Sequence, residues 1–566
     1  MWAFPASLLL FLSPVTFGSF VGQRRTENGL HVPIYKAQAS NLQRRAAAIG
    51  LGDYFDVTYN VLLSIGNTEV PLILDSGSSD CWVLSDFCNS PQCSDTLGAK
   101  RYPQSSLRST GLDVRLLYGD SFTGTHALGL IGRDMVNLAG LGMQDQYFGA
   151  INSTNTSVLR TGSSGILGLG FPINSMIWFE LFKNEYVNSN QRREDISLSR
   201  RNNFRRPSFP PISELTQSWS LPSRYEARQE SSSRASIIAE LIMSTWPTYG
   251  PLMNRIIASF NLAPMVTIIL QRNTIDIGGN AGLLSIGELP FGVKNESLTW
   301  VSLRSYPPEE GGLNGPPDSP NEVYPIAWEI PIDDVYFDGE KLPPSALAAA
   351  DITLSALVDT GNSLLRGPPD TVREIQERLG GFRFACDTPH TLAFVIGGKM
   401  FPVDPRDFIT QIFEDSVETC GMNVVATDTP TRGDGYLYSW SLGVPFLKSV
   451  LSSYYYGNLT HPSHGPPRLG FLSTVPPDAN ERYRAAFEFA RDGDGNFPGI
   501  IEEAPTSVPA IATTNSDGVP LAQPSVAGSR GTGRTNTATA QLIRTPSPLH
   551  GSLIALSMAA GTMLWS

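Results

Sequence analysis

The chain has 566 residues, 41% of them hydrophobic, so it is long enough for two or three domains with a large core. Its 52 glycines and 43 prolines favour a turn-rich β protein over a helical one. The net charge of −12 argues against nucleic acid as a partner, because phosphate backbones attract basic surfaces.

The N-terminus has the features of a secretory signal peptide. Residues 1–21 are mostly apolar, and the small residues Gly18 and Gly22 precede the basic pair Arg24 and Arg25. A segment of this kind directs a chain into the secretory pathway, where disulfides are permitted. A buried N-terminal strand is the alternative.

Residues 22–50 carry several basic residues but few core-forming runs. We interpret this segment as a short propeptide, with a dibasic processing site at Arg44 and Arg45. A frayed N-terminal segment explains the same composition, and the two interpretations stay open.

Two apolar runs, residues 59–65 and 70–74, are separated by Gly66 and Asn67 and predict a β-hairpin. The second run leads into Asp75, which is followed by the small residues Ser76, Gly77, Ser78 and Ser79. A strand followed by such a turn presents an acid in a polar pocket. One copy alone is ordinary turn chemistry.

The same pattern occurs again at Asp359, where an apolar run leads into Asp-Thr-Gly-Asn-Ser. Between the two copies lies a Leu-Leu-Tyr-Gly-Asp-Ser-Phe-Thr-Gly segment at 116–124, which reads as a hairpin. A segment of hydrophobic residues and glycines follows each copy along the chain, at 165–170 and at 440–447. Phosphate binding by these glycines is disfavoured, because no Lys-Ser/Thr follows and no βαβ pattern surrounds them.

As a set, these motifs resemble the pepsin-like aspartic endopeptidases, over about residues 50–180 and 245–480. The resemblance implies an all-β, bilobal pepsin-like aspartic protease fold, two similar β lobes with the active-site cleft between them. Each lobe would contribute one aspartate. The expected boundaries are 51–296 for the N-terminal lobe and 297–480 for the C-terminal lobe.

The resemblance makes Asp75 and Asp359 the catalytic pair. Two carboxylates in one site cannot both ionise, so one proton is held between them. The ionised partner would take a proton from water while the protonated partner hydrogen-bonds the scissile carbonyl, without metal or cofactor. The residues expected to support the pair are Ser76, Gly77, Ser78, Thr360, Gly361 and Asn362.

Within this group, Ser76 and Thr360 are expected to brace the opposite turn with their hydroxyls. Asn362 departs from the family pattern, which commonly has Thr or Ser there, with a hydroxyl that donates to the nearby aspartate. Because an amide can also donate, we expect altered acidity of the pair with retention of activity.

The resemblance also predicts a flap over the substrate at Tyr118, Gly119 and Asp120, where Tyr118 would help to exclude water. In fungal relatives a carboxylate at the position of Asp120 is associated with accepting Lys or Arg beside the cut. A solvated turn acid is the alternative for Asp120.

The chain has five cysteines. The spacings of Cys88 with Cys93 and of Cys386 with Cys420 are similar to those of pepsin-family disulfides. Cys81 is left over in an apolar strand, so a buried inert thiol is favoured over a reactive one.

Residues 183–240 depart from the family and form a polar, Ser-rich insert with repeated Arg pairs, which we expect to be a disordered surface loop. A processed loop, a contact surface and a translated intron all stay open. A second surface insertion is expected at 307–320.

Residues 481–540 are rich in Ser, Thr, Pro and Gly and predict a stalk. Residues 541–566 end in a short apolar tail, which matches a GPI-attachment signal with Asn536 as the predicted site; Gly528, Gly533 or a plain frayed tail are alternatives. Glycosylation sequons stand at Asn152, Asn155, Asn295 and Asn458.

The sequence therefore predicts a secreted, fungal-type (yapsin-like) aspartic endopeptidase, made as a zymogen and GPI-anchored at the cell surface in plasma membrane or wall. We expect polypeptide substrates, no nucleic acid, and a monomer. The alternative is a catalytically inactive relative that serves as a surface binding or cell-wall protein.

Overall fold

The computed structural model describes residues 24–25, 28–33, 35–36, 58–94, 99–119, 124–190, 239–240, 243–270, 272, 282–432 and 436–498. The predicted signal peptide, most of the insert at 183–240, the anchor segment, Asp120 and Asn536 lie outside these residues. Their interpretations stay predictions.

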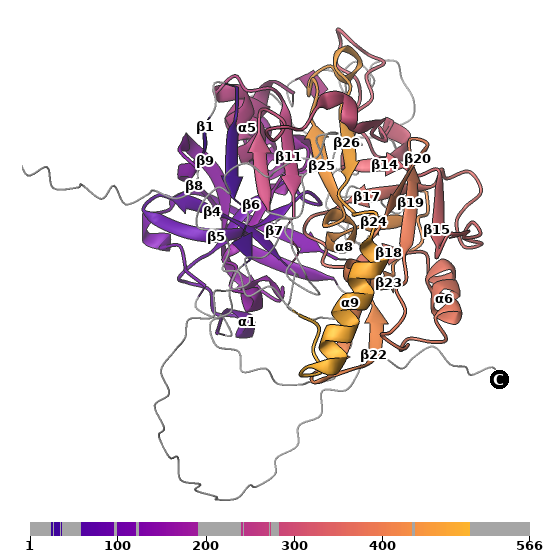
Figure 1. Ribbon diagram of the computed structural model, residues 1–566. Helices are drawn as coiled ribbons and strands as arrows, with labels where there is room; N and C mark the ends of the chain where they lie inside the picture. The colour runs from indigo at the N-terminus through magenta and orange to yellow at the C-terminus, as the bar shows by residue number, and fades with distance from the viewer. Residues whose placement is uncertain are drawn as a thin grey trace, which may run out of the picture. The chain divides into compact units, whose positions relative to one another are not determined.

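The first lobe is built on an eight-stranded sheet, drawn in indigo and purple in Figure 1. In spatial order its strands are β3 (Tyr35–Lys36), β4 (Tyr59–Ile65), β5 (Thr68–Asp75), β10 (Gly165–Gly168), β6 (Cys81–Leu84), β9 (Leu141–Thr154), β8 (Thr125–Leu138) and β7 (Arg108–Tyr118).

The second lobe contains a five-stranded, a four-stranded and a two-stranded sheet. The first has the order β14 (Glu329–Pro331), β17 (Ser355–Val358), β24 (Trp440–Leu442), β18 (Leu365–Gly367) and β23 (Val424–Ala426). The second has the order β16 (Glu340–Lys341), β15 (Asp334–Phe337), β19 (Leu392–Ile396) and β20 (Lys399–Pro402), and the third pairs β21 (Ile409–Phe413) with β22 (Ser416–Met422).

A seven-stranded sheet takes strands from both halves of the chain. Its order is β1 (Arg24–Arg25), β2 (Leu30–Pro33), β12 (Leu283–Ile286), β11 (Met265–Ile269), β25 (Val450–Tyr455), β26 (Arg468–Ser473) and β13 (Thr299–Ser302). Because β11 pairs with β25, this sheet joins the two lobes.

Helices are few and short among the described residues. The helices whose bounds are defined are α1 (Pro91–Ser94), α2 (Met176–Asn190), α5 (Leu252–Ser259), α6 (Pro369–Arg378), α7 (Pro405–Phe408), α8 (Val444–Leu447) and α9 (Ala479–Asp492), and residues 239–240 and 243–249 are helical as well. Short 3-10 turns are η1 (Gln104–Ser106), η2 (Val158–Thr161), η3 (Pro172–Asn174), η4 (Asn295–Ser297), η5 (Pro308–Glu310) and η6 (Pro462–His464). None of the helices in the described ranges is long and apolar enough to span a membrane.

The two lobes repeat one local arrangement around the predicted aspartates. Strand β5 pairs in parallel with β10, which pairs antiparallel with β6; strand β17 pairs in parallel with β24, which pairs antiparallel with β18. The inner strands β6 and β17 are buried on both faces, which explains their continuous apolar sequences. The all-β, bilobal prediction is confirmed.

The N-terminal segment contributes more to the sheet than its composition indicates. In β2, Leu30 and Val32 are buried, and His31 bonds Ser285 Oγ and Glu288 Oε1, both at 2.7 Å. The interpretation of residues 22–50 as a propeptide stays a prediction. Removal of these residues would take strand β2 away from the edge of β12.

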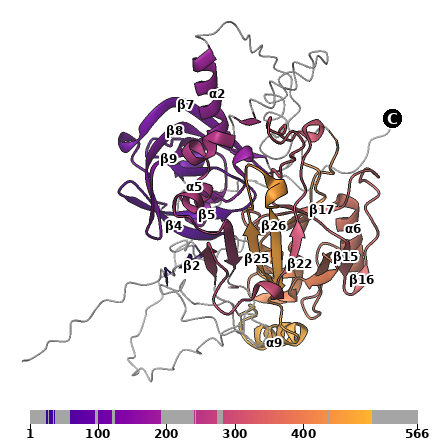
Figure 2. The ribbon, with the colours of Figure 1, turned by 90° about the horizontal axis from the view of Figure 1, so that it is seen from above.

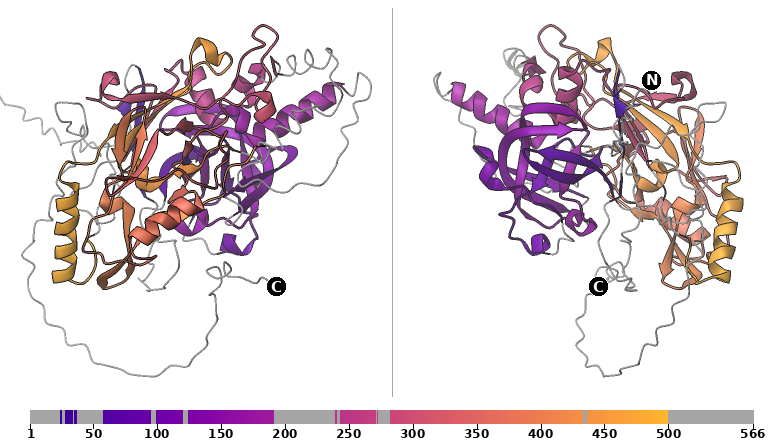
Figure 3. Two further views of the ribbon diagram at one scale, coloured as in Figure 1. Left: turned by 90° about the vertical axis from the view of Figure 1, so that its right-hand side faces the viewer. Right: turned by 60° about the vertical axis from the view of Figure 1, so that its left-hand side comes forward.

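The second lobe continues past its predicted end at residue 480. Helix α9 occupies the beginning of the expected stalk, and Tyr483 donates from its hydroxyl to the Cys386 carbonyl oxygen at 2.8 Å. Both views of Figure 3 show α9, in yellow, beside the orange strands of this lobe. Residues 481–492 of the predicted stalk region are therefore helical, and a stalk beyond the described residues, which run to 498, stays a prediction.

The predicted surface insertion at 307–320 is partly buried. Leu313 within it is buried, as are Tyr306 and Tyr324 on either side. An isolated β-bridge pairs these two tyrosines and closes the base of the loop.

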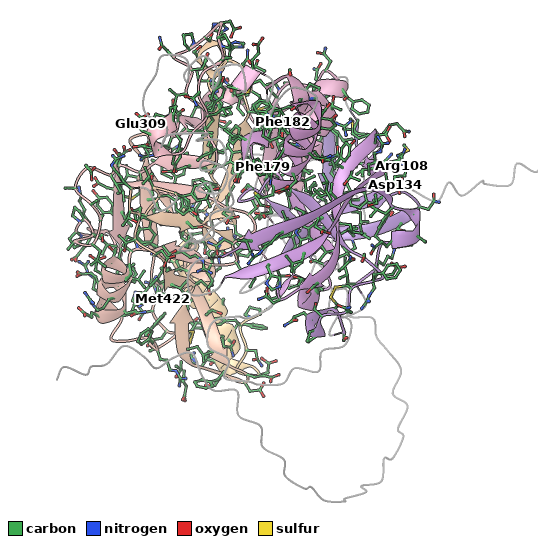
Figure 4. All side chains as sticks on the ribbon, turned by 180° about the vertical axis from the view of Figure 1, so that it is seen from behind. Arg108, Asp134, Phe179, Phe182, Glu309 and Met422 are labelled. Carbon is green, nitrogen blue, oxygen red and sulfur yellow. A yellow bond between two sulfur atoms is a disulfide. The ribbon has the colours of Figure 1, made fainter. Side chains whose placement is uncertain are left out.

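Helix α2 extends into the region predicted as a disordered insert, and its first turns are fixed by aromatic contacts. Figure 2 shows α2 beside β7, and Figure 4 labels Phe179 and Phe182 on it. Trp178 donates from Nε1 to Thr245 Oγ1 at 2.9 Å, and its ring meets that of Trp246 edge-on at 6.2 Å. The two flanks of the insert are therefore held together near Trp178.

We predict that replacing residues 191–238 with a linker of about 12 Gly and Ser residues leaves the thermal unfolding midpoint within a few degrees. Such a linker is long enough to span the roughly 18 Å from the end of α2 at Asn190 back to the level of Trp178, where the two flanks of the insert meet. Differential scanning calorimetry is the measurement. As a comparison, Trp246→Ala should lower stability by about 3–5 kcal/mol, because it empties a buried site. Loss of cooperative unfolding in the linker variant would show that the insert is part of the fold.

Candidate active site

Asp75 ends strand β5 and is only 5% exposed. The Gly77 amide donates to its Oδ1 at 2.9 Å, and the Ser78 hydroxyl donates to its Oδ2. Both donors stabilise the ionised form of this carboxyl.

Asp359 follows strand β17 and is 6% exposed. The Gly361 amide donates to its Oδ1 at 2.9 Å, the counterpart of the Gly77 contact. The residue that corresponds in position to Ser78 is Asn362. Its Nδ2 donates to Ser441 Oγ at 2.9 Å, away from the carboxyl.

Two hydroxyls brace the turns against each other, one from each lobe. Ser76 donates from Oγ to the Val358 carbonyl oxygen at 2.8 Å, and Thr360 donates from Oγ1 to the Leu74 carbonyl oxygen at 2.7 Å. Each hydroxyl oxygen also accepts the backbone N–H of the other residue at 2.9 Å. This interlocked pair fixes the relative position of the two loops.

The glycines keep the carboxyls close. A Cβ atom at Gly77 would lie 2.5 Å from Asp359 Oδ1, and one at Gly361 would collide with Asp75 Oδ1. Any side chain at either position would push against the opposite carboxyl. The structure therefore brings both predicted aspartates into one site.

Burial raises the pKa of Asp75, although Ser78, a hydrogen bond from Asp359 and the Gly77 amide oppose the rise. Burial, followed by the charge of Asp75, raises the pKa of Asp359 well above its usual value. Among the described residues the hydroxyl of Ser78 donates to Asp75, and the pKa of Asp359 is raised further by the charge of Asp75, so both effects favour Asp359 as the place for a shared proton.

In this geometry the Asn362 amide donates to Ser441 and not to the aspartate, and the expected change in acidity stays a prediction. Besides bonding Ser441, Asn362 accepts at Oδ1 from the Leu364 amide at 3.2 Å and from Arg366 Nε at 3.4 Å. The charge of Arg366 is one of the influences that lower the pKa of Asp359. The side chain therefore affects the pair through its neighbours.

Tyr118, the predicted flap residue, ends strand β7. Its hydroxyl accepts a hydrogen bond from Trp82 Nε1 at 2.8 Å, and burial raises its pKa well above the usual value. Gly119 follows with a φ of 86°, which a residue with a side chain rarely adopts. The basic-residue preference attributed to Asp120 stays a prediction.

The sequence interpretation missed two buried residues that follow Asp75 closely in the chain. Trp82, which holds Tyr118, could have been noticed as a ring with a polar edge in an apolar strand. Asp80 accepts the Met176 amide at 2.8 Å and the Ile177 amide at 3.2 Å and so caps α2. Burial raises the pKa of Asp80 to about 6.

The structure contains both predicted disulfides, Cys88–Cys93 and Cys386–Cys420. Cys81 is a buried free thiol, and burial raises its pKa to about 12, which leaves it unreactive.

The four predicted glycosylation sites differ in exposure. Asn155 and Asn295 are exposed, whereas Asn152 and Asn458 are half-buried. The Oδ1 atom of Asn152 accepts the Ser85 hydroxyl at 2.6 Å. Glycan attachment therefore stays a prediction, best supported by exposure at Asn155 and Asn295.

Known proteins are similar in sequence to this chain over about three quarters of its length. The chain is 21% identical over 464 residues to the major aspartyl peptidase 1 of Cryptococcus neoformans, covering 78% of this chain and 74% of the relative. It is 25% identical over 421 residues to pepsin A of Rhinolophus ferrumequinum (72% and 81% covered), and 22% identical over 460 residues to cathepsin E of Cavia porcellus (78% and 89% covered).

The family model for eukaryotic aspartyl proteases matches residues 58–193 and 287–461. The gap between these matches contains most of the insert, and each match contains one of the two aspartate turns. The chain belongs to the eukaryotic aspartyl protease family, whose members are hydrolases that act on peptide bonds.

Proposed function

We propose that the protein is an aspartic endopeptidase that works at acidic pH, with Asp359 protonated and Asp75 ionised. The observation that carries this proposal is the pair of facing carboxyls, each braced by a glycine amide, with a hydroxyl donor on Asp75 alone. Family membership supports the reaction class.

In the proposed reaction, Asp75 takes a proton from a water molecule as the water oxygen attacks the scissile carbonyl carbon. Asp359 donates its proton to the carbonyl oxygen, which gives a neutral tetrahedral diol. Asp75 then passes its proton to the leaving nitrogen, the carbon–nitrogen bond breaks, and a diol hydroxyl returns its proton to Asp359. The enzyme ends in the protonation state in which it began.

Peptide cleavage between about pH 3 and 7 by purified protein truncated before Asn536 tests this proposal. The expected result is cleavage that is fastest at acidic pH, because the pair must hold one proton. Folded protein that cleaves no peptide, even after removal of residues up to Arg45, would favour the alternative of a catalytically inactive surface or cell-wall protein.

We propose further that the protein is a secreted zymogen held at the cell surface by a GPI anchor. The apolar N-terminus, the two disulfides and the short C-terminal apolar tail support this location. Phosphatidylinositol-specific phospholipase C should release the full chain from cells, whereas truncation before Asn536 should send it into the medium. Retention of the truncated chain on cells would contradict the anchor.

A further inference from the structure

Asn60 in strand β4 is a buried amide without hydrogen bonds. Its side chain is 0% exposed, and neither Nδ2 nor Oδ1 has a partner in the described part of the chain. Buried polar side chains in folded proteins are nearly always paired, because an unmade hydrogen bond lowers stability. An unpaired amide is therefore a reason to look for a ligand that would pair with it.

Asn60 lies on the sheet face that carries the catalytic Asp75. It is the register partner of Ile73 on the adjacent strand β5, so the two side chains point to the same face. Side chains alternate along a strand, so Asp75 shares the face of Ile73. A diagonal neighbour of this kind lies roughly 7–8 Å away, within reach of a substrate residue beside the cut.

The surroundings of Asn60 on this face are apolar and continue to the flap. Ile73 is in register with Ile166, and Ile166 is in register with Trp82, which holds the flap residue Tyr118. These three residues belong to one buried cluster against which Tyr118 packs. Asn60 is thus a polar side chain at one end of this row of apolar residues.

The other neighbour of Asn60 is the N-terminal segment. Strand β3 pairs with β4, with Tyr35 in register with Asn60. Residues 22–50 are the predicted propeptide, so removing them would uncover β4 at Asn60. This would open the edge of β4 beside Asn60 in the processed enzyme.

We propose that Asn60 is a specificity-determining residue of this endopeptidase and binds a side-chain amide of the substrate, from Asn or Gln. An amide offers one acceptor and one donor group, which match the two unpaired groups of Asn60. An apolar substrate residue would leave both groups unpaired, which gives strong discrimination. This inference rests on the proposed peptidase function and propeptide.

Paired peptides that differ only in Gln against Leu, at each position within four residues of the cut, test the inference. At one position, the processed enzyme should show a kcat/KM at least about tenfold higher for Gln. Asn60→Leu has a similar shape without the amide and should remove that preference. Its unfolding midpoint should stay level or rise by a few degrees, because an unpaired polar group is lost.

Asn254→Leu is the matched control. Asn254 in α5 is also buried, and both of its amide atoms are unpaired among the described residues, but α5 packs on β9 and its buried residues belong to a different cluster from that of Ile73. This variant should retain the peptide preference of the parent enzyme. If Asn254→Leu changes the unfolding midpoint as much as Asn60→Leu does and yet keeps the peptide preference, the loss of preference in Asn60→Leu is not an effect of altered stability.

Equal kcat/KM for Gln and Leu at every position, or a Gln preference that survives Asn60→Leu, would overturn the inference. If Asn60→Leu does not fold, Asn60→Thr replaces it and must reduce the same preference. Failure of the parent enzyme to cleave any peptide would instead refute the peptidase function. Cleavage without any amide preference would refute only the role of Asn60.

Discussion

Replacing either Asp75 or Asp359 with Asn should lower kcat by about 10³-fold or more at every pH from 3 to 7. An amide keeps the shape of the carboxyl but cannot take the proton from water at position 75 or supply the shared proton from position 359. Because the two groups act as one unit, the double variant should be no slower than either single variant. Hydrolysis of a quenched peptide over this pH range is the measurement.

Both variants should remain folded, since burial already disfavours the ionised carboxyls. The raised pKa values mean that the folded chain binds more protons than the unfolded chain above pH 3.8, so these groups lower stability as pH rises. A neutral amide at either position removes this loss of stability at higher pH, so the unfolding midpoint of each variant at pH 7 should not fall. Asp387→Asn, at an exposed aspartate of the second lobe, should leave kcat unchanged. Cleavage that persists in Asp359→Asn would refute the two-carboxyl mechanism.

Asn362→Thr should move the alkaline limb of the kcat/KM profile about one pH unit toward acid. A threonine hydroxyl at this position can donate to Asp359, as Ser78 donates to Asp75. A hydrogen bond to the ionised form lowers the pKa of Asp359, and about one unit is the size expected for one such bond. Activity requires the proton on the pair, so it is lost at lower pH in the variant. Initial rates at low substrate concentration from pH 3 to 8 give both limbs.

Asn362→Ala separates the added hydroxyl from the lost amide. The amide donates to Ser441 and helps to hold Arg366, whose charge lowers the pKa of Asp359. Its loss should leave the alkaline limb in place or move it toward higher pH, opposite to the threonine variant. An alkaline limb that stays unchanged in Asn362→Thr would mean that residue 362 does not set the acidity of the pair.

The catalytic turns could be predicted from the sequence because each is a short, local pattern. An apolar strand leading into Asp, a hydroxyl residue and Gly needs no knowledge of distant residues, and two copies raise its specificity. The fold class followed from the same motifs. By contrast, the direction of the Asn362 amide depends on Ser441, which is 79 positions away in the chain.

The elements missed by the sequence interpretation were short or hidden by composition. Strand β2 has four residues, too few for an alternating pattern to stand out. The predicted stalk region includes helix α9, although Tyr483, Ala486 and Ala490 follow the spacing of a buried helical face. A window restricted to residues 479–492 would have revealed that period, which the Ser- and Pro-rich sequence beyond it obscured.

The interlocked hydroxyls of Ser76 and Thr360 also bear on how the chain is made. Each bonds a backbone carbonyl that lies more than 280 positions away, so neither aspartate loop is complete while only the first lobe has left the ribosome. A nascent or truncated first lobe would hold one unbraced carboxyl and no partner to share a proton. Proteolytic capacity would thus arise only after both lobes have been synthesised, which spares the cell from an enzyme that is half made.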